Sequence, residues 1–180
     1  MSTQRYDAVA IALHWGIAAL IAAAFGLGLT VDDFPKAYEG MVVNTHVLIG
    51  LAVIVLSLTR VGWRLAHRPP ALPRENSAKM EAAAKLVHIL LYILMIAVPL
   101  IGIPTLLYRG RGVDFGLLQI RPLAPRVPEI FHPLTELHEL TAYALVLLAV
   151  GHVLAALYHQ FILRDDLVRR MTPRTIAGRS

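Results

Sequence analysis

Cysteine is absent from the chain. Without cysteine the protein cannot hold an iron–sulfur cluster through thiolates, attach a c-type heme through thioether bonds, or form a disulfide. The absence does not indicate a reducing compartment, because a bundle embedded in lipid is stabilised without disulfides. Any redox centre in this chain must therefore be held by other side chains.

Charged residues are also scarce, at 16% of the chain, whereas 57% of the residues are apolar and the mean hydropathy is +0.61. These proportions are typical of polytopic membrane proteins and lie outside the range of ordinary soluble domains. Four stretches reach the roughly 20 residues needed to cross a hydrocarbon layer of about 30 Å. We expect transmembrane helices at about residues 8–30, 41–64, 80–107 and 134–163.

A secretory signal would be shorter and would end in a small-residue cleavage site, whereas the first apolar stretch continues through Phe25, Leu27 and Leu29. We expect it to be retained as a helix. No internal repeat or low-complexity tract is visible, so residues 1–180 are predicted to form a single domain. The predicted fold class is all-α, a four-helix, up-and-down transmembrane bundle.

Prolines mark the connections between the predicted helices. The segment Asp32–Pro35 is expected to be an acidic outer turn, and three prolines within residues 69–73 predict a non-helical inner loop. Residues 108–133 are too long for a bare connection and hold four more prolines. We expect them to form a structured outer cap loop, which could include a short interfacial helix.

The third predicted helix contains Pro99 and Pro104 with Gly102 between them. A proline inside a helix removes one backbone hydrogen bond and crowds the preceding turn. We therefore expect this helix to kink or unwind toward its outer end.

The net charge of +5 does not indicate a nucleic-acid partner, because the basic residues stand beside the apolar stretches rather than on one polar surface. Membrane topology explains their distribution. With both termini in the cytoplasm, the 17 basic residues divide 12 to 5 in favour of the inner side. The outer five are Lys36, Arg109, Arg111, Arg121 and Arg126; the inner twelve are Arg5, Arg60, Arg64, Arg68, Arg74, Lys79, Lys85, Arg164, Arg169, Arg170, Arg174 and Arg179.

Histidines are the chemically informative residues of the apolar stretches. His138 and His152, on the fourth stretch, lie fourteen residues apart. On a helix this interval is about 21 Å and only some 40° short of four whole turns, so both imidazoles face the same side at two depths. Such an arrangement suits two stacked hemes better than it suits contact with lipid.

Depth matching pairs these histidines with those of the first two helices. His14 lies near the inner start of the first helix, and His46 lies near the outer start of the second. We therefore expect His14 and His152 to hold an inner heme b, and His46 and His138 an outer heme b, with both axial positions of each iron filled.

Other interpretations of single residues remain open. Any one membrane histidine can simply form a hydrogen bond between helices. A dinuclear carboxylate site would need inward-facing Glu-x-x-His repeats, whereas Glu136 and Glu139 lie only at the outer end of the fourth helix. Glycines near the expected ligands, Gly16, Gly50 and Gly151, either admit a flat cofactor or serve ordinary helix packing.

The inner end carries further polar residues. His159 lies seven residues beyond His152 on the same stripe and is a candidate to bind a quinone carbonyl, or else an interfacial anchor. His88, near the inner start of the third helix, either assists that site or bridges helices. The arginines at 60, 64 and 68 either reach the interface or bind heme propionates. His67 and His132 are expected to lie in loops, exposed to solvent.

These residues resemble the bacterial cytochrome b561 family of diheme, four-helix membrane proteins. The likeness spans nearly the whole chain. Its elements are Leu13-His14-Trp15, His46 with Gly50, the segment His88–Tyr92 leading to Pro99–Gly102, His138-Glu139, Gly151-His152, Tyr158-His159 and Met171-Thr172-Pro173.

The resemblance implies that His14, His46, His138 and His152 are the iron ligands of two b hemes in a multi-pass protein of the bacterial inner membrane. For one branch of the family it further implies oxidation of superoxide at the outer side and delivery of the electrons to ubiquinone. His159 matches a position associated with the quinone. Gln160 stands where family members often have a second histidine, although glutamine can still donate a hydrogen bond.

The excess of outer arginines agrees with an anionic substrate, because positive charge at an aqueous face attracts an anion in a salt-dependent manner. Arg109 and Arg111 are the candidate steering residues. Two other functions remain open. The protein could be a cytochrome b anchor that passes electrons between a partner hydrogenase or dehydrogenase and the quinone pool, or it could be a structural membrane protein without a redox cofactor.

Overall fold

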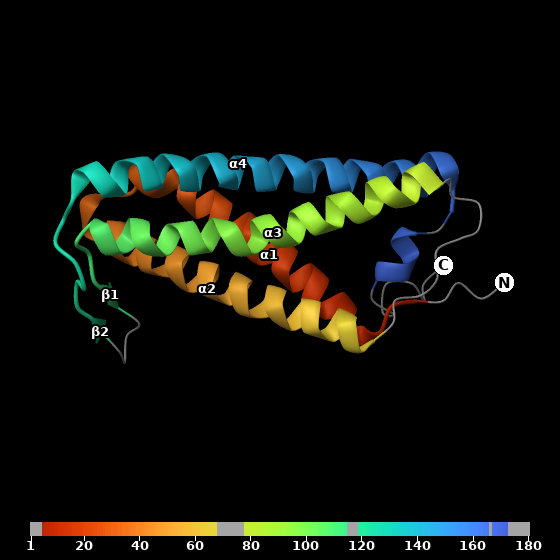
Figure 1. Cartoon of the computed structure of the whole chain (residues 1–180), viewed down its shortest axis with the longest axis horizontal. Helices are drawn as coiled ribbons and strands as arrows, with labels where there is room; N and C mark the ends of the chain where they lie inside the picture. The colour runs from red at the N-terminus through yellow and green to blue at the C-terminus, as the bar shows by residue number, and fades with distance from the viewer. Residues whose placement is uncertain (1–4, 68–77, 115–118, 166, 173–180) are drawn as a thin grey trace.

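The computed structural model describes residues 5–67, 78–114, 119–165 and 167–172. Four long helices run back and forth along one axis (Figure 1): α1 (Ala8–Thr30), α2 (Lys36–Ala66), α3 (Ala78–Tyr108) and α4 (Pro128–Tyr158). All four are long and apolar enough to cross a membrane. The predicted all-α, four-helix transmembrane fold is confirmed. We call the end with the strands β1 and β2 the outer end, and the opposite end the inner end.

The start of α1 is fixed by a side-chain cap. The Asp7 carboxylate accepts a hydrogen bond from the Ala10 backbone N–H at 2.9 Å, which satisfies one of the free donors of the first helical turn. The helix passes into a short 3-10 turn, η1 (Val31–Asp33), before Pro35. The first helix and the acidic outer turn therefore agree with their sequence-based prediction.

Two helices begin earlier than expected. α2 begins at Lys36 rather than near residue 41, and α4 begins at Pro128 rather than near residue 134. Hydropathy marks only the part of a helix that lies in hydrocarbon, whereas these polar first turns extend beyond it. Thirty-one residues of helix span about 46 Å, well over the roughly 30 Å of the lipid core. His132 consequently lies on α4, exposed as predicted but not in a loop.

The outer cap is a small antiparallel hairpin rather than a helix. Its strands are β1 (Val113–Asp114) and β2 (Gln119–Ile120), with Val113 opposite Ile120. Gly110, in the turn before β1, has a φ of +66°, a conformation that favours glycine. The prediction of a structured cap is correct, and the described part of the cap contains no interfacial helix before α4 begins.

α3 remains helical through Pro99 and Pro104, and it bends along its length in Figure 1. Of the two predicted alternatives, a kink or unwinding toward the outer end, the unwinding does not occur. The bend agrees with the loss of the backbone hydrogen bond that the Pro99 nitrogen would otherwise donate one turn back. The predicted proline-rich inner loop, at residues 69–73, lies outside the described residues, as do Arg68, Arg74, Arg174 and Arg179.

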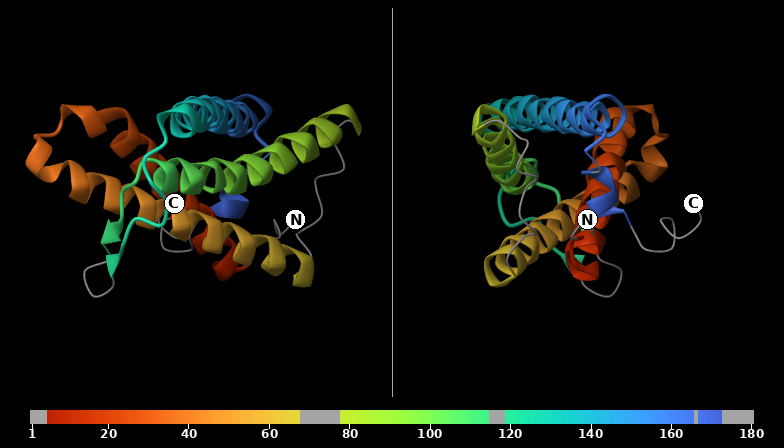
Figure 2. Two further views of the ribbon diagram at one scale, coloured as in Figure 1. Left: turned by 60° about the vertical axis from the view of Figure 1, so that its left-hand side comes forward. Right: turned by 90° about the vertical axis from the view of Figure 1, so that its right-hand side faces the viewer.

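Helix packing divides the bundle into two hairpins. Among the described residues α1 packs chiefly on α2 and α3 on α4, while α2 and α3 join the two pairs. The helices are inclined to one another, as the views of Figure 2 show. The buried core takes residues from every helix: Ile17, Val53, Met95, Val98 and Leu145. Outward side chains such as Leu147 and Leu140 are 75% and 67% exposed in the isolated chain. These leucines contact lipid in a membrane.

The inner end is closed by the last part of the described chain. After α4 come the π-helical turn η2 (His159–Leu163) and the 3-10 turn η3 (Val168–Met171). The Tyr6 N–H donates to the Arg170 carbonyl at 3.2 Å, and the Trp15 indole N–H donates to the Met171 carbonyl at 2.9 Å. The beginning of α1 and the segment after α4 therefore lie at the same end of the bundle.

Candidate functional site

The predicted outer pair of histidines is brought together between α2 and α4. The ring centres of His46 and His138 are 5.9 Å apart. The Nδ1 atom of His46 lies 3.0 Å from the Ala24 carbonyl of α1, and that of His138 lies 2.9 Å from the Val98 carbonyl of α3. A carbonyl oxygen only accepts, so Nδ1 of each ring carries the proton. Each Nε2 is then left as a free lone pair, as a metal-ligating histidine requires.

Two glycines make room for these imidazoles. A Cβ atom on Gly102 would lie 3.1 Å from Cε1 of His138, and one on Gly28 would lie 3.5 Å from Cε1 of His46. Of the glycines named from the sequence, Gly50 faces Pro99 of α3, whereas a Cβ atom on Gly16 or Gly151 would have no neighbour within 4 Å among the described residues. The glycines that contact the candidate ligands are thus ones that we had not assigned to this role.

The predicted inner pair is also brought together. The ring centres of His14 on α1 and His152 on α4 are 6.3 Å apart. His88 of α3 joins them, with its ring centre 5.2 Å from that of His152. The inner site therefore contains three imidazoles rather than two. Depth matching extended to the third helix would have found His88, which lies about three turns from the inner start of α3, much as His14 lies about two turns from that of α1.

A charged side chain also reaches the inner site. Arg60 of α2 is half-buried, and its Nε–H donates a hydrogen bond to the Tyr92 hydroxyl of α3 at 3.0 Å. Its positive charge interacts electrostatically with the three inner histidines. Arg64, one turn further along α2, is exposed and interacts with His88 alone among those three.

Both histidine pairs fit a heme held by two axial imidazoles. Rings that bind one metal ion from opposite sides, through bonds of roughly 2 Å, have centres about 6 Å apart. The outer and inner pairs, at 5.9 and 6.3 Å, have this spacing. Each pair also joins α4 to a helix of the other hairpin, and α4 packs chiefly on α3. The donor set and the helix arrangement therefore suit flat groups between the two hairpins.

His159 lies at the inner end, on the first residue of η2. Its Nδ1–H donates to the Asp165 carboxylate, and both side chains are mostly buried. The second Asp165 oxygen accepts the Leu167 backbone N–H at 3.3 Å. Asp165 thus fixes the orientation of the His159 ring and leaves Nε2 for another partner. The adjacent Gln160 has a buried side-chain oxygen without a hydrogen-bond partner among the described residues.

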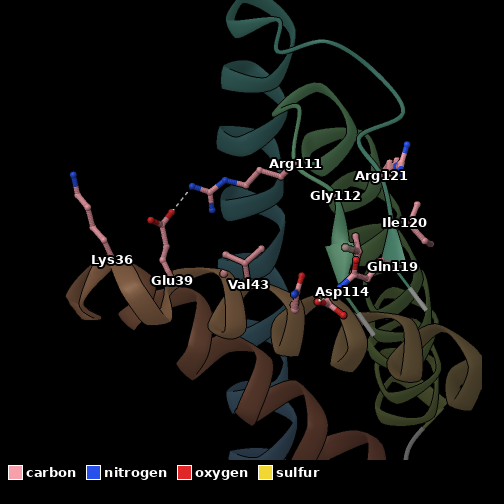
Figure 3. Close-up of a pocket in the computed structure, with 12 residues that line it drawn as sticks. Lys36, Glu39, Val43, Arg111, Gly112, Asp114, Gln119, Ile120 and Arg121 are labelled. Carbon is pink, nitrogen blue, oxygen red and sulfur yellow. Dashed lines mark hydrogen bonds and ion pairs between the residues drawn. The ribbon is translucent and has the colours of Figure 1, made fainter. Parts of the chain in front are cut away.

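The outer arginines divide into two groups. Arg111 pairs with Glu39 of α2 at 2.6 Å, beside a pocket of about 480 Å³ between the first turns of α2 and the hairpin (Figure 3). Arg109 and Arg126 lie over the ring of Phe131, with their guanidinium carbons 5.6 and 5.5 Å from its centre. The charge of Arg111 is therefore matched by a carboxylate, and the structure brings Arg126 rather than Arg111 to Arg109.

Comparison with known proteins places these features in a family. The family model described as prokaryotic cytochrome b561 matches residues 5–174. A probable superoxide oxidase CybB of Yersinia pestis is 30% identical over 174 residues, which cover 95% of this chain and 97% of that protein. Cytochrome b561 homolog 1 of Escherichia coli (strain K12) is 30% identical over 94% of this chain and 98% of its own length. Cytochrome b562 of Cereibacter sphaeroides is 31% identical over 92% of this chain and 94% of its own length.

Proposed function

Because the chain belongs to the prokaryotic cytochrome b561 family, a family of b-type electron-transfer cytochromes of the bacterial inner membrane, we propose that it is a superoxide:ubiquinone oxidoreductase. In this reaction two superoxide ions each give up one electron and become O₂. The two electrons and two protons then convert ubiquinone to ubiquinol. The name of the Yersinia pestis relative supports superoxide as the donor.

We propose that the protein holds two b hemes, one between His46 and His138 and one between His14 and His152. When bound, heme supplies the one-electron oxidation and reduction. The chain's own contribution is to fix the imidazole rings: Nδ1 of the two outer ligands donates to carbonyls of neighbouring helices. The arrangement of two imidazole pairs at opposite ends of one apolar bundle is the observation on which this function rests.

At the outer end, the proposed attraction of superoxide rests on Arg109 and Arg126. Superoxide is a small anion that does not readily enter lipid, so it must meet the protein at an aqueous face. The two guanidinium groups share the ring of Phe131 at the start of α4, where the positive end of the helix dipole adds to their charge. Arg111, which Glu39 neutralises, contributes less.

At the inner end, His159 is the proposed quinone-binding residue. Its Nδ1–H is engaged by Asp165, so Nε2 faces the ligand and can exchange a proton with a quinone oxygen. The unpartnered oxygen of Gln160 supplies a second polar contact next to it. Since amide oxygen and nitrogen are interchanged by a flip, Gln160 can accept from a quinol hydroxyl or donate to a quinone carbonyl.

The test follows heme absorbance of the purified, detergent-solubilised protein while an enzyme generates superoxide, with and without a soluble ubiquinone analogue. We expect rapid reduction that superoxide dismutase abolishes, followed by reoxidation only when the quinone is present. Replacement of His159 by Leu should slow the reoxidation and leave the reduction unchanged.

Hemes that dithionite reduces but superoxide does not would contradict the proposed donor. That result would favour the alternative, an electron-transfer subunit that exchanges electrons with a partner hydrogenase or dehydrogenase. A colourless preparation would contradict both functions and leave a structural membrane protein.

A further inference from the structure

Arg60 occupies on α2 the position that His152 occupies on α4. Fourteen residues separate His46 from Arg60, the same interval that separates His138 from His152. On a helix this interval returns to nearly the same face about 21 Å further along. α2 therefore presents an imidazole to the outer site and a guanidinium to the inner site.

The environment of Arg60 leaves most of its hydrogen-bonding capacity unused. Its Nε–H is held by the Tyr92 hydroxyl at 3.0 Å, which orients the group but does not compensate its charge. Among the described residues no carboxylate forms an ion pair with Arg60. A guanidinium within a transmembrane span is costly without a counter-ion, and it normally marks a functional partner.

The neighbours of Arg60 indicate which anion it binds. It is hydrogen-bonded to Tyr92, which lies one helical turn beyond His88 on α3, and the His88 ring centre is 5.2 Å from that of His152, so the guanidinium lies beside the proposed inner heme site. Heme b carries two propionate carboxylates at one edge of the ring. Arginine binds a carboxylate through two parallel N–H donors, and the two terminal nitrogens of Arg60 remain for such a contact.

We propose that Arg60, oriented by Tyr92, binds a propionate carboxylate of the inner heme and so determines which edge of that heme faces α2. This inference rests on the proposed inner heme of His14 and His152. A fixed positive charge beside the heme favours its reduced form, which carries one positive charge less. Arg60 therefore raises the midpoint potential of the inner heme relative to the same heme without it.

The experiment is a potentiometric titration of heme absorbance in the purified holoprotein, compared among Arg60→Met, Arg60→Lys, Tyr92→Phe and the wild type. At a fixed potential, Arg60→Met should lower the ratio of reduced to oxidised inner heme about tenfold, which is 59 mV for a one-electron couple. Arg60→Lys keeps the charge and should shift the ratio less. Tyr92→Phe should shift it in the same direction as Arg60→Met, but by a smaller factor.

Arg64→Met is the matched control, because it removes the same charge one turn away on the same helix. A His138→Ala background, which should keep only the inner heme, assigns the titrating component. Resonance Raman spectra of the propionate bending modes provide a readout independent of the potential. These modes should change in Arg60→Met and remain unchanged in Arg64→Met. A low heme content in Arg60→Met that Arg60→Lys restores would also support the contact.

Unchanged potentials and propionate modes in Arg60→Met, at an unchanged heme-to-protein ratio, would overturn the inference, and so would an equal shift in Arg64→Met. Neither result depends on superoxide or quinone. A wild type with two titrating hemes that ignores superoxide would contradict the proposed donor while the role of Arg60 is decided by its own shift. A wild type with a single heme would overturn both the two-heme assignment and this inference.

Discussion

The lack of a Cβ atom at two glycines allows their helices to lie close to candidate histidine ligands. Gly102 and Gly28 both face an imidazole, but a Cβ on Gly102 would come within 3.1 Å of His138 whereas one on Gly28 would remain 3.5 Å from His46. The first distance is tighter than normal packing, and the second is ordinary van der Waals contact. The two positions therefore form a matched pair of substitutions.

We expect Gly102→Ala to displace the His138 ring by a few tenths of an ångström and weaken the outer heme. The heme-to-protein ratio of the purified variant should fall from about two toward one. Gly28→Ala should keep a ratio near that of the wild type. Equal ratios in both variants would show that Gly102 does not limit the position of the ligand.

The carboxylate of Asp7 should make the free energy of unfolding of the protein depend on pH. Its pKa is lowered from the ordinary value of 3.8, first by the hydrogen bond from the Ala10 N–H and also by that from the Trp63 indole. A carboxylate with a lowered folded-state pKa stabilises the protein above its unfolded pKa, and this contribution is lost as the pH falls through the folded value. Because Asp7 is exposed, solvent screening keeps the effect modest.

Thermal unfolding of Asp7→Asn should test this effect, because asparagine caps a helix about as well as aspartate but carries no charge. The wild type should unfold at a higher temperature than the variant at pH 7, and the difference should disappear as the pH falls through the lowered folded-state pKa of Asp7. Asp7→Ala should be less stable than Asp7→Asn both at pH 7 and at low pH, by up to about 1 kcal/mol. A difference that persists at low pH would assign the stability to the cap alone.

The sequence predicted the two histidine pairs, but it missed His88 at the inner site and did not show what fixes the rings. The pairing followed from depth along helices, a local quantity. The contacts of His46 with Ala24 and of His138 with Val98 depend on the rotation of neighbouring helices. That rotation is set by packing across the whole bundle, so no local pattern could have predicted these contacts.

For helices and strands as well, the sequence predicted the features that depend on one segment and missed others. Hydropathy located all four helices, because a run of apolar residues is a property of one segment. The same measure missed the polar first turns of α2 and α4, which lie beyond the hydrocarbon. The outer hairpin was missed as well, because strands of two residues carry too short a pattern to distinguish from a loop.

The outer cap and the start of α4 together carry the predicted attraction of superoxide. Replacing both Arg109 and Arg126 by Gln should slow superoxide-driven heme reduction several-fold at low salt, and the difference from wild type should shrink as salt is added. Stopped-flow absorbance at two ionic strengths would measure this. Arg111→Gln is the control, since Glu39 already neutralises that charge.

If the double variant matched the wild type in rate and in salt dependence, steering by Arg109 and Arg126 would be excluded. A larger effect of Arg111→Gln than of the double variant would show that superoxide is attracted by Arg111, at the pocket between α2 and the hairpin. Heme spectra of all variants should be unchanged, because the three arginines contact none of the candidate ligands.

At the scale of the whole molecule, the distribution of basic residues predicts the orientation in the membrane, and the absence of cysteine makes that orientation measurable without background. A single cysteine at Leu123, in the outer connection, should react with a membrane-impermeant maleimide in spheroplasts. One at Leu65, near the inner end of α2, should react only after permeabilisation. The two side chains are 74% and 82% exposed, so access to the reagent does not distinguish them. The reverse labelling pattern would show that the protein has the opposite orientation in the membrane.

Both proposed heme sites take one ligand from α4, and the remaining ligands come from α1 and α2. The ribosome makes α4 after α1, α2 and α3. A chain caught partway through synthesis or membrane insertion can therefore complete neither site, however long its earlier spans have resided in the bilayer. Arrival of α4 completes both sites in a single event, so we expect biogenesis to yield protein with either no heme or two, and little with one.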